Sequence, residues 1–442
     1  MKIIVNRNLN KISYREKLMI RGVEIMDLTM FNVKFGECIQ LETDNDEALM
    51  IDCGTKNSKK IANDIAIDFY NKKIAEKNAM ISHFDSDHIS GFEYLASSKK
   101  YKKAFDKFYI PYITVYKDPS GITRNIIIEV AIYLYLFTSD KGLTYHQSKA
   151  LLQHIEIVTA LTKKCNNIFA LSRGDKFILE SKNFNVLWPD ERFNYYSDLD
   201  YMVKIVDEIE SEFKHLDEFN EIKDLKNRIT DNMTKWFNIV KDNVKGEDST
   251  AEHIDDIDGI VNEIAENQKK FMEELNWYKN RIARGESYFT LMDSAPTLSI
   301  RILKYVVSKD FYKDMNDTSI VFQNEKLKCL FTGDATNIAM RQIDRNQDFL
   351  TEYSLIKLQH HATGRYYSES LPHADRLIIS NGGYTNFKIG YKFGKYLNRG
   401  NGKIYCTNGV DGRTNYCEIY EDNGRNCPNN CILQGGDIKL RL

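Results

Sequence analysis

Four of the six residues in the segment His83-Phe84-Asp85-Ser86-Asp87-His88 can bind a metal ion. Imidazole nitrogens and carboxylate oxygens are common ligands of Zn²⁺ and of harder ions such as Mn²⁺. A purely structural explanation exists, because Asp and His are frequent in turns and can cap a helix. A cap or a solvated turn does not require so many ligands in so short a run. The segment therefore predicts a metal site and, with it, hydrolysis by an activated water.

More residues of these types follow apolar segments that have the pattern of buried strands. The pairs are residues 48–51 with Asp52, 79–82 with His83, 328–332 with Asp334, and 355–358 with His360 and His361. Mixed α/β folds place their chemistry at the carboxyl ends of strands. We therefore expect these side chains to gather at one edge of the fold.

The order of these motifs resembles the metallo-β-lactamase superfamily, which has an HxHxDH run after a strand. In this chain Asp85 stands where the superfamily has its second histidine. The closest branch in appearance is the hydrolase domain of ComEC-like competence proteins, which act in bacterial DNA uptake. The motifs that resemble this branch are Val33 to Glu37, Ser82 to Gly91, Asn316 to Val321, Leu330 to Asp334 and His360 to Thr363. The resemblance covers residues 27 to about 190 and 315 to 420.

The resemblance implies an α+β fold, the metallo-β-lactamase αββα sandwich, with two divalent metal ions, Zn²⁺ or Mn²⁺. Asp334 would bridge the ions. His83 and Asp85 would bind one ion, and the other would lie between Asp87, His88 and His360, with His361 as a further candidate. Asp52 matches the upstream aspartate and would act on a ligand or loop, so Asp52 and Asp87 are the candidate catalytic residues.

Two features depart from the superfamily pattern. The histidine that usually precedes the TGD strand is missing, and Asn316 or Asp317 lies there instead. Asp317 is therefore either an additional ligand or a residue that points away and caps the neighbouring turn. Oxygen ligands at positions 85 and 317 would favour Mn²⁺ or Mg²⁺.

Residues 192–299 are the second departure and form an insertion. Apolar residues recur at steps of three and four from Tyr201 to Val244, which predicts one long amphipathic helix, and again from Ile254 to Ile282. We expect an antiparallel helical hairpin that serves as a partner or dimer module, inserted in a hydrolase body of residues 1–191 and 300–442. A protein partner, or self-association as in a coiled coil, would cover the apolar stripe of residues 197–287.

Four cysteines crowd the C-terminal region and could form a structural zinc site. They are Cys406, Cys417, Cys427 and Cys431. Their spacing is not that of paired CxxC motifs, so free thiols in a β-rich region are the alternative.

Composition and charge restrict the class of protein. Apolar residues make up 42% of the chain, which argues against disorder, and no apolar run reaches the roughly 20 residues of a membrane span. The N-terminus lacks a signal-peptide pattern, so we expect a cytoplasmic protein. Residues 197–287 hold 23 acidic and 13 basic residues, and the remainder holds 40 and 48. A mildly basic body suits a phosphate-bearing substrate.

These observations predict a metal-dependent hydrolase, namely a phosphodiesterase or nuclease that cleaves DNA or RNA with a hydroxide activated by two metals. The alternatives are hydrolysis of a small ester, a lactone or a cyclic nucleotide at the same site. A third alternative is an effector subunit that becomes active when its hairpin binds a sensor protein.

Overall fold

The computed structural model describes residues 26–56, 58–112, 116–117, 123–138, 143–191, 199–246, 257–286, 316–381, 388–398, 402–407, 417–418, 431–433 and 436–442. Every structural statement below concerns these residues.

The first β-sheet has seven strands and combines antiparallel with parallel pairing. In spatial order they are β19 (Ile438–Arg441), β1 (Met26–Met30), β2 (Cys38–Thr43), β3 (Glu47–Cys53), β4 (Glu76–Met80), β5 (Phe105–Pro111) and β8 (Cys165–Leu171). From β3 to β8 the neighbouring strands are parallel. Their carboxyl ends therefore lie at one edge of the sheet, where the segments after β3 and β4 meet.

The second sheet has eight strands. In spatial order they are β18 (Cys431–Leu433), β17 (Lys403–Cys406), β16 (Arg376–Ile379), β14 (Leu355–Lys357), β12 (Cys329–Phe331), β11 (Val321–Asn324), β10 (Lys182–Trp188) and β9 (Lys176–Leu179). The strands from β12 to β18 are parallel. Two short ladders complete the β structure, formed by β6 (Tyr116–Lys117) with β7 (Thr123–Arg124) and by β13 (Glu352–Tyr353) with β15 (His373–Ala374).

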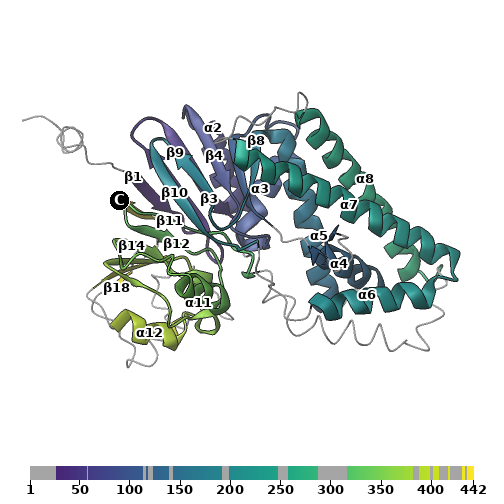
Figure 1. Cartoon of the computed structure of the whole chain (residues 1–442). Helices are drawn as coiled ribbons and strands as arrows, with labels where there is room; N and C mark the ends of the chain where they lie inside the picture. The colour runs from purple at the N-terminus through teal and green to yellow at the C-terminus, as the bar shows by residue number, and fades with distance from the viewer. Residues whose placement is uncertain are drawn as a thin grey trace, which may run out of the picture.

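The two sheets pack face to face through an apolar core that both supply. Tyr109 on β5 contacts Phe177 on β9 with ring centroids 5.1 Å apart, so an aromatic pair crosses between the sheets. Helices lie outside this pair of sheets (Figure 1): α2 (Lys59–Asn71) and α3 (Ser86–Ser97) pack on β3, and α11 (Asn337–Arg345) packs on β10. The helix α12 (Tyr391–Asn398) packs on the short 3₁₀ helix η3 (Gly364–Tyr366). The structure is mixed α/β, which is compatible with the expected α+β class.

The predicted single helix from Tyr201 to Val244 is wrong, because the structure has two helices there. The helix α6 (Leu199–Phe213) ends at a turn, and α7 (Asp217–Gly246) begins with Asp217 and Glu218 in its first turn. Phe213 and Phe219 pack on each other across the turn, with ring centroids 5.4 Å apart. The apolar period therefore continues through the break and hides it from the sequence.

The third helix of the insertion is α8 (Ile257–Ala283), which packs on α7, α4 (Ile126–Phe137) and α5 (Leu143–Leu161). The short 3₁₀ helix η1 (Thr162–Lys164) follows α5 along the chain. The helix α7 also packs on β8. In Figure 1, α4 to α8 form one helical layer beside the first sheet. The expectation that the apolar stripe of the insertion is uncovered is wrong, because the helical layer buries this stripe. Phe219, Phe237 and Leu275 on α7 and α8 are 0% exposed. The role of residues 192–299 as a partner or dimer module stays a prediction.

No helix in the described part of the chain is both long enough and apolar enough to cross a bilayer.

Candidate metal centre

Both sheets deliver residues to one site. The loop after β4 and the start of α3 carry His83, Asp85, Asp87 and His88. On the other side, the turn after β12 carries Asp334, and the 3₁₀ helix η2 (Gln359–Ala362) follows β14 with His360 and His361. The site therefore lies where the carboxyl ends of parallel strands from two sheets face each other.

The histidines converge on a single oxygen atom, Oδ2 of Asp334. The Nε2 atoms lie 3.3 Å (His88), 3.6 Å (His361), 3.7 Å (His360) and 3.9 Å (His83) from it. Four imidazole nitrogens that point at one carboxylate oxygen are arranged to share a cation, because neutral imidazole and carboxylate both offer lone pairs.

Each of these histidines is held by its other ring nitrogen. The Nδ1 partners are Ser82 Oγ for His83 (3.1 Å), Asp52 Oδ2 for His88 (2.8 Å), Thr363 Oγ1 for His360 (2.6 Å) and Ser380 O for His361 (2.6 Å). Outer partners of this kind fix the orientation and tautomer of metal-binding histidines. The arrangement leaves every Nε2 directed at the centre of the site.

The aspartates divide into two groups. Asp85 Oδ2 lies 3.7 Å from His83 Nε2, and Asp87 Oδ2 lies 3.5 Å from His361 Nε2. Asp52 is fully buried behind these residues and accepts hydrogen bonds from the Ser82 amide and hydroxyl, each at 2.7 Å. Asp52 therefore positions His88 and Ser82 rather than facing the centre.

The backbone is strained at the same residues. His360, His361 and Ala362 have φ values of 44°, 55° and 59°, and Asp52 has a φ of 53°. The left-handed region costs about 1–2 kcal/mol for a residue with a Cβ atom. Such strain persists where the surroundings enforce it, and it gathers at functional sites.

Gly333 allows the turn before Asp334 to approach the loop after β4. Its φ is 49°, and an added Cβ would lie 3.1 Å from Ser82 Cβ and 3.2 Å from Ser319 Cβ. A larger residue would be both strained and crowded, so it would move Asp334 away from the histidines.

The electrostatic field of the site attracts positive charge. Burial opposes ionisation of Asp334, but the histidines, His361 foremost, hold the pKa of its carboxyl well below the ordinary value. Burial would also lower the pKa of His88, yet Asp334 and Asp52 raise that pKa well above its usual range. Burial lowers the pKa of His360 to about 3, which leaves this imidazole neutral at pH 7 and able to bind a metal.

The residues present fit divalent metal ions. The Nε2 atoms of His83, His88 and His361 and the Oδ1 atom of Asp87 are buried without a hydrogen-bond partner in the described part of the chain. Such buried atoms are costly unless they are satisfied. Four sets of three residues lie close enough together to hold an ion. Two of them are His83 with His88 and Asp334, and Asp87 with His88 and His361; the other two contain Glu37, with either Asp52 and His88 or Asp334 and His361. The number and identity of the ions stay predictions.

The structure modifies two details of the predicted ligand set. His361 faces both Asp87 and Asp334, whereas His360 is paired with Asp334 and stacks on Tyr366 with ring centroids 3.7 Å apart. His361 is therefore at least as well placed as His360 beside Asp87. Asp317 accepts a hydrogen bond from Thr336 at the start of α11, which supports the capping alternative over a ligand role.

The cysteines have no comparable geometry. Cys406 on β17 and Cys431 on β18 lie on adjacent strands, and Cys417 forms an isolated bridge with Ile389. No candidate metal cluster in the described ranges contains a cysteine, and Cys427 lies outside the described residues. The structural zinc site stays a prediction.

Four residues of the site were not found from the sequence. Lys56 Nζ lies 3.1 Å from Asp87 Oδ2. Burial would lower the pKa of Lys56, but the nearby Asp87 carboxylate raises it, and the net pKa is above the ordinary value. His154 on α5 bonds the carbonyl of Phe84 in the metal loop. Lys357 and Glu37 form a buried ion pair below Asp334. Lys357 had a sequence signal, because a lysine interrupts an otherwise apolar strand, and Glu37 ends the motif Val33 to Glu37, which the sequence did not mark as part of the site.

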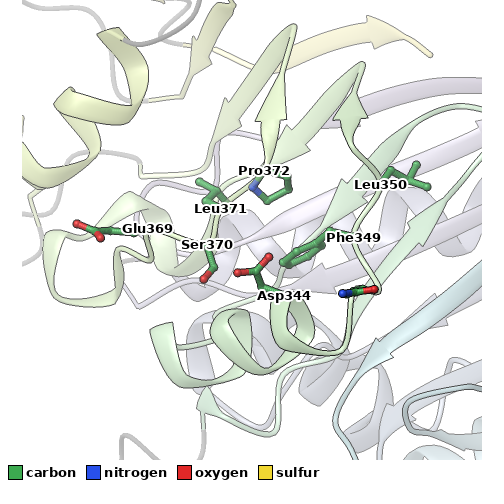
Figure 2. A pocket seen from close by; sticks show the side chains of 8 residues that line it. Asp344, Phe349, Leu350, Glu369, Ser370, Leu371 and Pro372 are labelled. Carbon is green, nitrogen blue, oxygen red and sulfur yellow. The ribbon is translucent and has the colours of Figure 1, made fainter.

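The cavity in Figure 2, about 430 Å³, lies elsewhere, between the end of α11 and the segments 347–350 and 369–372. Its lining residues are Asp344, Gln347, Phe349, Leu350, Glu369, Ser370, Leu371 and Pro372. None of the candidate ligands lines it, so it is not the metal centre.

Comparison with known proteins corrects the family resemblance. No curated protein matches the chain. The resemblance to ComEC-like hydrolases of the metallo-β-lactamase superfamily is wrong, because the matching family model belongs to a different family. The motifs misled because the geometry of a bound metal dictates the ligand types and spacing, whatever the substrate. The chain is similar to the family described as Anti-Pycsar protein Apyc1 over residues 31–117, a segment that contains Glu37, Asp52, His83, Asp85, Asp87 and His88.

Proposed function

We propose that this chain is a metal-dependent phosphodiesterase that opens the phosphodiester ring of a cyclic nucleotide. The observation that carries the proposal is the convergence of four Nε2 atoms on Asp334 Oδ2, within 3.3–3.9 Å. The chain's similarity to the Anti-Pycsar family supplies the substrate class, since anti-Pycsar proteins degrade cyclic nucleotides.

Hydrolysis of DNA or RNA, the main expectation from the sequence, now has weaker support. It rested on the ComEC-like resemblance and on the mildly basic body, and the resemblance is wrong. The basic body suits a phosphate in a small nucleotide as well as it suits a polymer. Hydrolysis of a cyclic nucleotide, which the sequence offered as an alternative, is therefore the better hypothesis. Activation by a sensor protein bound to the insertion stays a prediction.

Divalent ions held by the histidines, Asp87 and Asp334 would supply Lewis acidity, lowering the pKa of a water and offsetting charge on the phosphoryl oxygens. The chain itself supplies orientation and charge. Asp52 and Ser82 fix His88 and His83, so that both imidazoles face Asp334. Lys56 places an ammonium beside Asp87. Of these two side chains only that of Lys56 is partly exposed, so its ammonium can also pair with a phosphate of the substrate.

The test is hydrolysis by the purified protein with Mn²⁺ or Zn²⁺. The substrates are cyclic pyrimidine and purine mononucleotides, with single-stranded DNA, RNA and a generic phosphodiester for comparison. Chromatography should show a linear nucleoside monophosphate formed from a cyclic substrate. Degradation of nucleic acid with intact cyclic nucleotides would overturn the proposal.

The matched variants are His88→Ala and His373→Ala. His373 is an exposed histidine on β15 and is not a candidate ligand. We expect His88→Ala to lose activity by about 10²-fold or more, since even an outer partner of a metal ligand is worth roughly 10–100-fold. His373→Ala should keep wild-type activity. Equal activity in both variants would remove the site assignment.

A further inference from the structure

Lys357 carries a charge in the interior of the second sheet. It lies on β14 and is 0% exposed, and Glu37, which is 1% exposed, is its ion-pair partner. A buried ammonium is costly, and a buried ion pair often adds no stability over apolar residues of similar size. Stability alone is therefore a weak reason for this pair.

The contacts of Lys357 lead to the metal centre. Its Nζ donates to the carbonyl of Gly333 at 2.8 Å, pairs with the Glu37 carboxylate and lies 3.7 Å from Asp334 Oδ1. Gly333 and Asp334 form the turn that presents the central carboxylate. The lysine therefore contacts this turn through the carbonyl of Gly333 and lies near the carboxylate of Asp334.

The two oxygens of Asp334 have different surroundings. Oδ2 faces the four histidines, and Oδ1 faces Lys357. The Asp334 amide donates to Ser319 Oγ at 3.2 Å, which fixes the backbone of the residue. An ammonium 3.7 Å from Oδ1 attracts that oxygen, while the histidine nitrogens lie beside Oδ2.

Glu37 extends this contact to the first sheet. Its amide donates to the Asp87 carbonyl at 2.9 Å, and its carbonyl accepts from the Gly54 amide at 2.9 Å. Asp87 is a candidate ligand at the start of α3, which follows β4 of the first sheet, and Asp334 is one in the turn after β12 of the second sheet. The Glu37–Lys357 pair therefore connects the two ligand-bearing loops across the sheets.

We propose that Lys357 and Glu37 are a positioning pair, which aims Asp334 Oδ2 at the histidines and fixes its distance from Asp87. The inference rests on the proposed metal-dependent function. It assigns the pair no contact with the substrate. The consequence is that loss of the pair weakens metal binding even when the protein stays folded.

The test is the double variant Glu37→Gln/Lys357→Met. The single variant Lys357→Met would leave a buried carboxylate unpaired and could prevent folding, whereas the double variant leaves the net charge unchanged. Because the charge is constant, a change in metal affinity reports the loss of the Glu37–Lys357 pair and not a change in the net charge of the site. Removal of the lysine's positive charge alone would instead strengthen cation binding.

The matched control is Glu129→Gln/Lys226→Met, which removes another buried ion pair, the one between α4 and α7. Both of its side chains are 4% exposed. Calorimetric titration with Mn²⁺ gives the affinity, and thermal unfolding without metal gives the stability. We expect the Glu37/Lys357 variant to bind Mn²⁺ about 10–100-fold more weakly. The control should lose stability at least as much and keep wild-type affinity.

Wild-type affinity in the folded Glu37/Lys357 variant would overturn the positioning role and leave the proposed function intact. An equal loss of affinity in the control would also overturn it, because the effect would then be general destabilisation. A wild-type protein that binds neither Mn²⁺ nor Zn²⁺ would instead refute the metal centre itself.

Discussion

At the residue scale, the candidate site depends on how its side chains are oriented more than on how many it has. Asp52 shows this, because it faces away from the centre and bonds the amide and hydroxyl of Ser82 and Nδ1 of His88. The hydrogen bond from Nδ1 to a carboxylate requires the proton on Nδ1. When the ring carries a single proton, Nε2 of His88 is therefore the free nitrogen and can bind a metal.

Asp52→Asn should therefore weaken metal binding with little change in fold. If the new amide nitrogen faces His88, Nδ1 must accept a hydrogen bond and the ring proton moves to Nε2. We expect Mn²⁺ affinity to fall by about 10–100-fold, measured by titration calorimetry. Asp27→Asn, at a half-exposed carboxylate on β1, is the control and should bind Mn²⁺ normally. Unchanged affinity in Asp52→Asn would show that the carboxylate does not set the tautomer.

At the element scale, the strands that end at candidate ligands could be predicted from the sequence. A strand that is buried on both faces has a continuous apolar run in the sequence, so the strand ends at Asp52, His83 and Asp334 could be predicted. The break between α6 and α7 was not visible, because one buried stripe runs through both helices. The Glu37–Lys357 pair was not visible either, since its partners lie on different sheets and pair only after the sheets pack.

The same elements are joined by buried charges that a pattern of apolar residues cannot reveal. Glu129 on α4 lies 2.8 Å from Lys226 on α7 and 2.7 Å from Arg124. Burial would raise the pKa of Glu129, but Arg124 first and then Lys226 lower it below its ordinary value. The ionised form is therefore favoured in the folded state.

The sign of the pH effect follows from this lowered pKa. Glu129 contributes stability above the ordinary glutamate pKa, and the contribution is lost as the pH falls through the folded-state pKa. Glu129→Gln should thus destabilise the protein at pH 7, by about 3 kcal/mol for a broken buried pair. The difference from wild type should shrink in acid. Urea unfolding between pH 3 and pH 7 measures both, and a difference independent of pH would contradict the argument.

At the scale of the whole molecule, the helical layer and the metal centre are physically continuous. The helix α5 packs between α3, which carries Asp87 and His88, and α8 of the insertion. His154 on α5 bonds the Phe84 carbonyl inside the metal loop. Lys241 on α7 pairs with Asp175 and Glu191, which lie in the segment around β9 and β10. The insertion therefore supports the body instead of projecting from it.

Replacement of residues 197–287 by a short Gly/Ser linker should consequently damage the body. The position of the insertion, between strands and not within one, would by itself predict the opposite, a folded and metal-binding core. The structure shows that the deletion would expose the faces of α4, α5 and β8 that pack on α6 to α8, including Tyr133, whose ring stacks on Phe219. Each fully buried large apolar side chain contributes roughly 1.5–3 kcal/mol. The loss of several such contacts approaches the 5–15 kcal/mol that stabilise a typical domain.

We therefore expect the shortened chain to aggregate or to unfold without cooperativity, and to bind less metal because His154 loses its support. Calorimetric unfolding, binding of a dye to exposed apolar surface, and bound metal per chain measure these effects. The control is Trp277→Ser, at an exposed residue of α8, which should keep cooperative unfolding and normal metal content. A shortened protein that unfolds cooperatively and holds wild-type metal would show that the body is stable by itself. In that case the helical layer would be available to serve as the partner module that the sequence predicts.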